Sequence, residues 1–316
     1  MSNDARSQIV DLLYVKTVND WLVEAKDLPP DRKLYDEFWS EFETCFLFGG
    51  PGSGKSILSV QIATEIAKNE PVLYCDFELS LRQFAKRYRS KDGRFFSFSG
   101  NFFRAEFQKN TEFNPESLIN SIHLNARKIN AKVIIIDNIS WIIENSEKGD
   151  HAGIFMKKLS RMKLDNGYSI LIVAHTPKRD NTQPINLTDM AGSMRLQNFI
   201  DSSFAIVQSS KMEGYRYIKQ TKTRSEELVY GFDNVKVGMI IQDVNGFTQM
   251  KWFGTANEME HLRRPNDNER ETIKQKCLDM LKMGKTYRDI HEDTGLSLGA
   301  ISKYKNQMNS DESLPF

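Results

Sequence analysis

The sequence has no marked excess of charge of either sign, because 43 Lys and Arg residues face 42 Asp and Glu residues, for a formal net charge of +1. This balance excludes both a strongly basic polyanion-binding coat and an acidic disordered chain. The sequence also lacks a run of about 18 consecutive apolar residues, so we expect no membrane span. Its N-terminal segment has neither the basic start nor the long apolar stretch of a secretory signal.

Cysteine is scarce: Cys45, Cys75 and Cys277 lie far apart in the chain, without the spacing of a metal site. We interpret them as reduced thiols of a cytoplasmic protein, two of them buried and the third in a C-terminal helix. With 40% hydrophobic and 27% charged residues, the composition is that of an ordinary soluble globular protein. Composition therefore defines the broad class of the chain and leaves its activity open.

The order of apolar and amphipathic segments predicts an α/β fold with added helical segments. Residues 1–40 are expected to be helical up to a proline-containing break. In residues 41–254, buried-strand patterns alternate with amphipathic helices, which indicates a core domain with a mostly parallel sheet covered on both faces. After about residue 200 the strand patterns follow one another without long helices, so we expect an antiparallel extension. Segment 94–107, RFFSFSGNFFRAEF, is expected to be a strand whose phenylalanines belong to the core.

A phosphate-binding loop is predicted between the first buried strand of this core and the helix that follows it. The residues GGPGSGKS fit the pattern G-x-x-x-x-G-K-[ST], and the flanking strand and helix supply the context that the motif requires. Glycines let backbone amides curl around phosphates at a helix N-terminus, where the helix dipole favours anions. We therefore expect ATP to be bound by Gly49, Gly50, Pro51, Gly52, Ser53, Gly54, Lys55 and Ser56.

Two side chains of this loop and one later carboxylate predict how the phosphates and a metal ion are held. Lys55 is expected to reach the β- and γ-phosphates, and the Ser56 hydroxyl is expected to ligate Mg²⁺. In KVIIIDN, four apolar residues precede Asp137, which places a carboxylate at the carboxyl end of a buried strand. A carboxylate at that point can hold the same Mg²⁺ through water. The sequence thus predicts ATP and Mg²⁺ as cofactors, with Ser56 and Asp137 as the metal residues.

Together with the residues between and after these motifs, the chain resembles the RecA-like P-loop ATPase core, and within it the RepA/DnaB type of hexameric replicative helicase. The resemblance runs from about residue 33 to residue 258. It implies that Glu78, in VLYCDFELS, activates the attacking water, with Asp76 as the competing candidate on the same side of the strand. Arg87 matches an arginine that the family places in the following helix; a solvated helix charge is the alternative.

The resemblance also assigns roles to residues later in the chain. His175 ends the strand SILIVAH and would sense the γ-phosphate; a strand-end histidine bonded to backbone is the alternative. In KQTKTR, Lys222 and Arg224 match a pair that reaches the nucleotide of a neighbouring subunit, where an arginine stabilises the charge that develops in phosphoryl transfer. A solvent-exposed basic strand is the alternative here. The match implies a site completed only in a homo-oligomer, expected to be a hexameric ring.

The end of the chain predicts a second, smaller domain. Polar residues 255–268 are expected to form a linker to three helical patterns in residues 269–309, with a disordered tail in 310–316. The segment TYRDIHEDTGLSLGAISKYKNQM has the register of a helix-turn-helix and is similar to small DNA-binding modules of resolvases and transcription regulators. A three-helix protein-interaction bundle is the alternative. In the DNA-binding interpretation, the major groove or its phosphates would be contacted by Ser297, Ser302, Lys303, Lys305 and Asn306.

These features lead to two hypotheses of function. The first is an ATP-dependent DNA-associated motor of the RepA-like helicase family, which acts with partner proteins in replication or mobilisation of DNA. The second is an ATP-switched DNA-binding regulator or assembly factor that recruits partners without unwinding. A ring that tracks DNA needs a positive lining, but loop 144–151 is more acidic than basic, and between residues 178 and 195 only Lys178 and Arg179 form a basic cluster. The thin lining favours the regulator, and the ATPase motifs favour the motor.

Overall fold

The computed structural model of the protein describes residues 13–108, 114–139, 151–191, 196–224, 227–264 and 266–312. The chain divides into two compact units, one before Lys33 and one from Lys33 onwards. In the first unit, α1 (Val18–Lys26) begins at the N-cap Thr17, and none of the described residues of this helix is buried. Across the ranges given above, no helix has the length and apolar character needed to cross a membrane.

The expectation of a helical segment up to residue 40 is wrong for residues 33–40. There β1 (Lys33–Tyr35) and β2 (Trp39–Ser40) form an antiparallel hairpin instead. Phe38 is buried and its ring centroid lies 5.1 Å from that of Phe204 in the core. The conformation of this segment is therefore determined by the burial of large aromatic side chains against the sheet and not by the local helical pattern.

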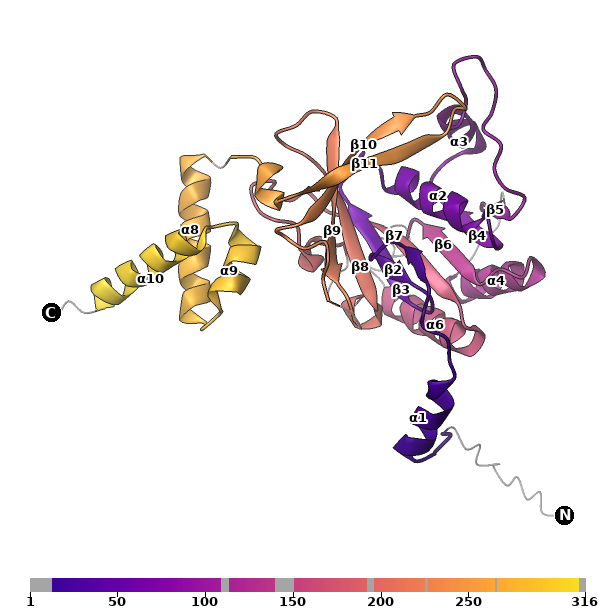
Figure 1. Ribbon diagram of the computed structural model, residues 1–316, viewed down its shortest axis with the longest axis horizontal. Helices are drawn as coiled ribbons and strands as arrows, with labels where there is room; N and C mark the ends of the chain where they lie inside the picture. Colours follow the sequence, from indigo (N-terminus) through magenta and orange to yellow (C-terminus); the bar gives the residue numbers. More distant parts are fainter. Residues whose placement is uncertain are drawn as a thin grey trace. The chain divides into compact units, whose positions relative to one another are not determined.

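The second unit is built on a nine-stranded sheet formed by the described strands, in the order β11-β10-β9-β8-β3-β7-β6-β4-β5 (Figure 1). The strands from β8 to β5 in this order run parallel, and β9, β10 and β11 are antiparallel to their neighbours. This confirms the predicted mostly parallel sheet with an antiparallel C-terminal extension. The strand bounds are β3 (Thr44–Gly49), β4 (Val72–Asp76), β5 (Phe102–Ala105), β6 (Val133–Asp137), β7 (Ser169–His175), β8 (Ser202–Gln208), β9 (Tyr215–Lys222), β10 (Val235–Gln242) and β11 (Thr248–Ala256).

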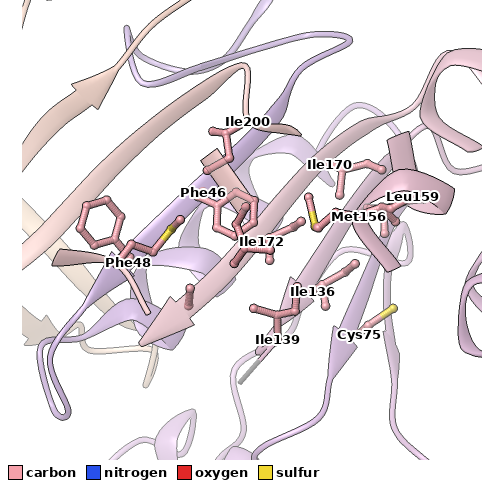
Figure 2. Packing of buried hydrophobic residues seen from close by; sticks show 14 of the residues in the cluster. Phe46, Phe48, Cys75, Ile136, Ile139, Met156, Leu159, Ile170, Ile172 and Ile200 are labelled. Atoms are coloured by element: carbon pink, nitrogen blue, oxygen red, sulfur yellow. The ribbon is translucent and has the colours of Figure 1, made fainter. Parts of the chain in front are cut away.

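Helices pack on both faces of this sheet, and each face has its own hydrophobic core. α2 and α3 contribute to one core, and α4 and α6 contribute to the other. Because side chains alternate along a strand, successive residues of β3 face opposite cores. Figure 2 shows the core on the α6 side, where Phe46, Ile136 and Ile172 of the sheet pack with Met156 and Leu159. The helix bounds are α2 (Lys55–Ile66), α3 (Leu81–Arg87), α4 (Pro115–Lys128) and α6 (His151–Asn166).

The phenylalanine-rich segment 94–107 differs from its prediction. Only Phe102–Ala105 forms a strand, β5, at the edge of the sheet. The preceding residues turn back along α3 and bring Phe96 and Phe98 onto the core on the α2 side. Phe95 does not pack on this core, and 64% of its surface is exposed. The segment therefore supplies core side chains, as predicted, but mostly from irregular backbone and with two exceptions, Phe95 and the 38% exposed Phe103.

The three C-terminal helices surround a small core of their own, in which Cys277, Ile290 and Ile301 are fully buried. Gly295 ends the second of these helices in the left-handed conformation, at φ 69°, which favours glycine. The bounds are α8 (Asp267–Lys282), α9 (Tyr287–Thr294) and α10 (Leu298–Glu312). Among the described residues, short 3₁₀ helices lie earlier at η2 (Leu187–Asp189), η3 (Gln197–Phe199) and η4 (Glu258–Glu260).

Both ends of this C-terminal region differ in detail from the predicted boundaries. The first residues of the expected linker belong to the core, because β11 extends to Ala256 and Glu258 is buried. The Glu258 carboxylate accepts a hydrogen bond from Lys219 at 2.7 Å and one from the hydroxyl of Tyr217 at 3.0 Å, which explains its burial. At the other end α10 continues to Glu312, into the expected tail. Residues 313–316, like most of loop 144–151, lie outside the described residues.

Candidate nucleotide site

The phosphate-binding loop lies where the motif predicted it, between the end of β3 at Gly49 and the start of α2 at Lys55. Two glycines are required by the geometry. Gly54, at φ 105°, holds a conformation that other residues rarely adopt. A Cβ on Gly49 would lie 2.2 Å from the carbonyl oxygen of Ile206, on the neighbouring strand β8. The loop therefore keeps its shape because side chains cannot be accommodated at these positions.

A cavity of about 400 Å³ lies beside this loop. Within it, the ammonium group of Lys55 donates hydrogen bonds to the carbonyl oxygens of Gly49 at 2.8 Å and Gly50 at 3.0 Å. Burial lowers the pKa of Lys55, and the carboxylates of Asp137 and Glu78 oppose this shift. The lysine is thus held at the loop by backbone carbonyls that phosphate oxygens can replace as partners. Arg87, Arg216 and Ile240 also line this cavity.

Asp137 has the environment of a metal-linked carboxylate. It is 1% exposed, and its Oδ2 atom accepts a hydrogen bond from the hydroxyl of Tyr74 at 2.6 Å. Its Oδ1 atom is buried and has no hydrogen-bond partner among the described residues. Desolvation raises the pKa of Asp137 to about 6, while hydrogen bonds from Tyr74 and Ser56 oppose the shift. An unpaired buried carboxylate oxygen beside the Ser56 hydroxyl fits the oxygen ligands that Mg²⁺ prefers, so these two residues would hold the ion, directly or through water.

This burial predicts a measurable pH dependence of stability. Because the pKa of Asp137 is higher in the folded chain than in the unfolded chain, the folded state binds the proton more tightly between about pH 4 and pH 6. The free energy of unfolding of the metal-free protein should therefore fall by about 3 kcal/mol as pH rises through this window. At pH 7 we expect Asp137→Asn to be more stable than the wild type, and the difference should narrow towards pH 4.

Urea unfolding with a chelator present, at pH 7, pH 5 and pH 4, measures this difference. Asp165→Asn, at an exposed position on α6, is the control and should run parallel to the wild type. Adding Mg²⁺ and ATP should stabilise the wild type more than Asp137→Asn. A constant difference between Asp137→Asn and the wild type across these pH values would contradict the assignment of a buried, destabilising charge to Asp137.

Glu78 and His175 come together at this site through a residue that the sequence analysis did not single out. Asn138 follows Asp137 directly, and its Nδ2 atom donates to the carboxylate of Glu78 and lies 3.1 Å from Nε2 of His175. The carboxylate of Glu78 and the ring of His175 are 3.9 Å apart. All three side chains lie at the carboxyl edge of the parallel strands, beside the phosphate loop. The sequence contains one signal for this role of Asn138: it is a polar residue directly after Asp137, at the end of the same buried strand.

The competing candidate, Asp76, has a different environment. It is 2% exposed and its Oδ2 atom accepts a hydrogen bond from Arg104 at 2.9 Å. Its Oδ1 atom accepts from the backbone amides of Glu78 at 3.2 Å and Leu79 at 2.9 Å. Asp76 is thus engaged in shaping the turn that presents Glu78, whose side chain lines the cavity. This geometry favours Glu78 as the group that acts on water.

Lys222 and Arg224 lie away from the nucleotide cavity of their own chain. Strand β9 runs antiparallel to β8, and Lys222 is opposite Ser203 at the beginning of β8, whereas the phosphate loop is at the end of the parallel strands. Arg224 donates to Asp201 at 2.6 Å, and 70% of its side chain is exposed. Burial and the charge of Arg224 lower the pKa of Lys222, with Asp201 opposing. The pair is therefore placed at the end of the strands opposite to the phosphate loop.

Strand β9 carries a different arginine into the cavity of its own chain. Arg216 lies opposite Gln208, at the other end of the β8–β9 pair, and donates from Nε to the carbonyl oxygen of Ser53 at 2.9 Å. The role of Arg216 could not be predicted from the sequence, because one basic residue among several on a strand carries no signal of which end of the sheet it occupies. The register of the sheet supplies that information.

The five residues predicted to contact DNA all lie on or just before α10. The hydroxyl of Ser297 accepts a hydrogen bond from the amide of Ala300 at 3.2 Å, so this residue caps the helix. The ammonium group of Lys305 lies 5.4 Å from the ring centre of Tyr287. Ile301 points into the small core, while the predicted contacts are exposed or half-buried: Ser297, Ser302, Lys303, Lys305 and Asn306. The helix thus presents these polar side chains away from its own core.

The fold and the site together define a P-loop ATPase of the RecA type. Residues 11–181 match the AAA domain family (AAA_25), and the chain belongs to this family. The DNA repair protein RadA of Streptococcus pneumoniae (strain ATCC BAA-255 / R6) is 23% identical over 184 residues, which cover 56% of this chain and 38% of RadA. The present chain thus spans well under half of that relative. A KaiC-like protein from Pyrococcus horikoshii OT3 has a similar fold, with a TM-score of 0.52 at 19% identity over 70% of this chain and 100% of its own.

Proposed function

We propose that the protein is an ATP-dependent, DNA-associated motor of the RepA-like helicase type. The observation that carries the proposal is the arrangement of the nucleotide site: Lys55 at the phosphate loop, Asp137 with a free oxygen beside Ser56, and Glu78 joined to His175 through Asn138. Such a site can bind ATP with Mg²⁺ and position a water for attack on the γ-phosphate. Replication or mobilisation of DNA, with its partner proteins, is the process in which this motor would act.

Assembly is part of the proposal. The position of Lys222 and Arg224 at the far edge of the sheet supports their action on the nucleotide of a neighbouring subunit, in a homo-oligomeric ring expected to be a hexamer. Each site would then lack its transition-state arginine until the ring forms. DNA is the proposed partner of the ring, and the polar face of α10 is its proposed duplex contact.

One observation favours the second candidate function, an ATP-switched DNA-binding regulator that recruits partners without unwinding. Of the two basic residues that follow His175, Arg179 is 12% exposed and lies 3.5 Å from the carboxylate of Asp189. It also donates to the carbonyl oxygen of Gln183. Within residues 177–191, this leaves Lys178 as the exposed basic side chain, so the loop offers little positive charge to a DNA strand.

Strand displacement on forked DNA, measured beside duplex binding with and without ATP, separates the two candidates. A motor unwinds the fork, and unwinding is lost in Glu78→Gln but kept in Glu65→Gln, an exposed glutamate on α2. A regulator binds duplex in an ATP-dependent way and displaces no strand. Absence of both activities in a protein that hydrolyses ATP contradicts both candidates.

A further inference from the structure

The positive charge of the chain is concentrated in one short segment. Residues 81–95 contain six basic residues and one acidic residue, a net charge of +5, so the rest of the chain carries a net charge of −4. This segment comprises α3 and the turn after it. Neither the nucleotide site nor the C-terminal helices use its exposed charges, since Arg87 alone lines the nucleotide cavity.

The basic side chains of this segment lie at the surface. Arg82 and Lys86 are exposed and spaced i,i+4, so they share one face of α3. Arg89 and Lys91 are exposed in the turn that follows. Arg94 is exposed as well, but it pairs with the single acidic residue of the segment. The other four exposed basic side chains form no ion pair with a described residue, although Asp92 follows Lys91 in the chain, and we call Arg82, Lys86, Arg89 and Lys91 the α3 basic surface.

An exposed aromatic ring lies at the end of this surface. Phe95 is 64% exposed, and the guanidinium group of Arg89 lies 5.7 Å from the centre of its ring. Beside the ring is a hollow of about 320 Å³, which is lined by Phe95, Ser97 and Asn245 among others. An exposed ring costs free energy in water unless a partner covers it. Phe95 therefore differs from Phe96 and Phe98, which pack on the core.

The turn that carries these residues is held in place by the hairpin of β10 and β11, which lies beside α3 in Figure 1. The side chain of Thr248 donates to the carbonyl oxygen of Arg87 at 2.7 Å, and Gln242 donates to that of Arg89 at 3.2 Å. A Cβ on Gly246 would lie 2.5 Å from the amide nitrogen of Ser90, so the two turns are in close contact. The charges and the ring are thus presented from a packed frame.

From these observations we infer that the α3 basic surface, with Phe95, binds single-stranded nucleic acid. Basic side chains that follow the phosphate backbone, together with an aromatic ring on which a base stacks, are the two elements of such sites. A duplex keeps its bases stacked on each other and cannot use Phe95, so the surface should prefer a single strand. The inference does not depend on ATP hydrolysis or on the C-terminal helices.

Fluorescence anisotropy of the full-length protein with labelled oligo(dT), oligo(U) and a duplex of matched length tests this inference. The double variant Lys86→Glu/Lys91→Glu should bind oligo(dT) more weakly, and its slope of log affinity against log salt should be about 1.4 smaller, because two phosphate contacts are lost at about 0.7 each. The control Lys128→Glu/Lys157→Glu makes the same charge change at exposed positions on α4 and α6 and should bind as the wild type does.

Phe95→Ala should weaken binding of oligo(dT) about tenfold while leaving duplex binding unchanged, because only an unpaired base can stack on the ring. Lys303→Glu/Lys305→Glu, on the proposed duplex contact, should weaken duplex binding and should lower oligo(dT) binding less than Lys86→Glu/Lys91→Glu does, which separates this surface from the C-terminal helices. Comparison of oligo(dT) with oligo(U) shows whether DNA or RNA is preferred. Equal binding by the α3 and control variants, or a loss caused by the C-terminal variant alone, would overturn the inference, even where ATP turnover is normal.

Discussion

Lys55→Ala is expected to reduce ATP turnover by about 10³-fold or more. The ammonium group of Lys55 is a charged donor at the phosphate loop, and donors preorganised for charge that develops in the transition state are worth this much. Among the described residues, this group donates to the carbonyl oxygens of Gly49 and Gly50, and its burial is unfavourable. We therefore expect the unfolding midpoint of the variant without nucleotide not to fall.

Measurement of phosphate release together with thermal unfolding checks both parts. Lys68→Ala, which removes an exposed lysine after α2 that pairs with Glu65, is the matched control and should keep normal turnover. Hydrolysis preserved in Lys55→Ala would mean that the phosphates are bound elsewhere, and the assignment of the loop would fail. A loss of turnover with a lower midpoint would indicate unfolding and not the loss of a catalytic donor.

Arg224→Ala is expected to lower turnover of the assembled protein by about 10³- to 10⁵-fold, the range for an arginine supplied in trans. Binding of ATP should be unchanged, because Arg224 lies at the edge of the sheet opposite its own phosphate loop. A mixture of Arg224→Ala and Lys55→Ala subunits should regain turnover, since some interfaces then combine an intact phosphate loop with an intact arginine. Neither variant can recover alone.

Arg161→Ala is the matched control for this experiment. Arg161 is also an exposed arginine in contact with an aspartate, at 2.9 Å from Asp165, but it lies on α6. It should keep normal turnover and should not alter the recovery in mixtures. If mixed subunits of Arg224→Ala and Lys55→Ala form oligomers and stay inactive, the arginine does not act across an interface. The exposed arginine would then be an ordinary surface charge paired with Asp201.

The features that could be predicted from the sequence are those that depend on adjacent residues. The apolar runs that end in Gly49, Asp137 and His175 predicted three parallel strands, and the fold confirms them. The loop at Gly54 was predictable because its glycine pattern reflects a local backbone requirement. The C-terminal helices were predictable for the same reason, since Gly295 ends one helix at a point set by its own conformation.

Other features depend on residues far apart in the chain. The hairpin at 33–40 follows from burial of Phe38 against Phe204, and the role of Asp76 follows from its contact with Arg104. Segment 94–107 suggests one strand, but ring contacts with Phe247, between β10 and β11, partly bury Phe96 and Phe98, while Phe95 stays exposed. These contacts join residues far apart in the chain, so a pattern in neighbouring residues cannot predict them.

The local sequence therefore specifies most of the elements, the phosphate loop and the ends of the strands that lead into the site, because helix periods, strand alternation and glycine conformations are properties of adjacent residues. Which groups meet is decided by packing and sheet register. The register of the sheet places Arg216 at the phosphate loop of its own chain and Lys222 at the opposite end of the strands, although both residues lie on β9. It also brings Glu78, Asn138 and His175 to one point from the ends of three strands, because parallel strands align their carboxyl ends.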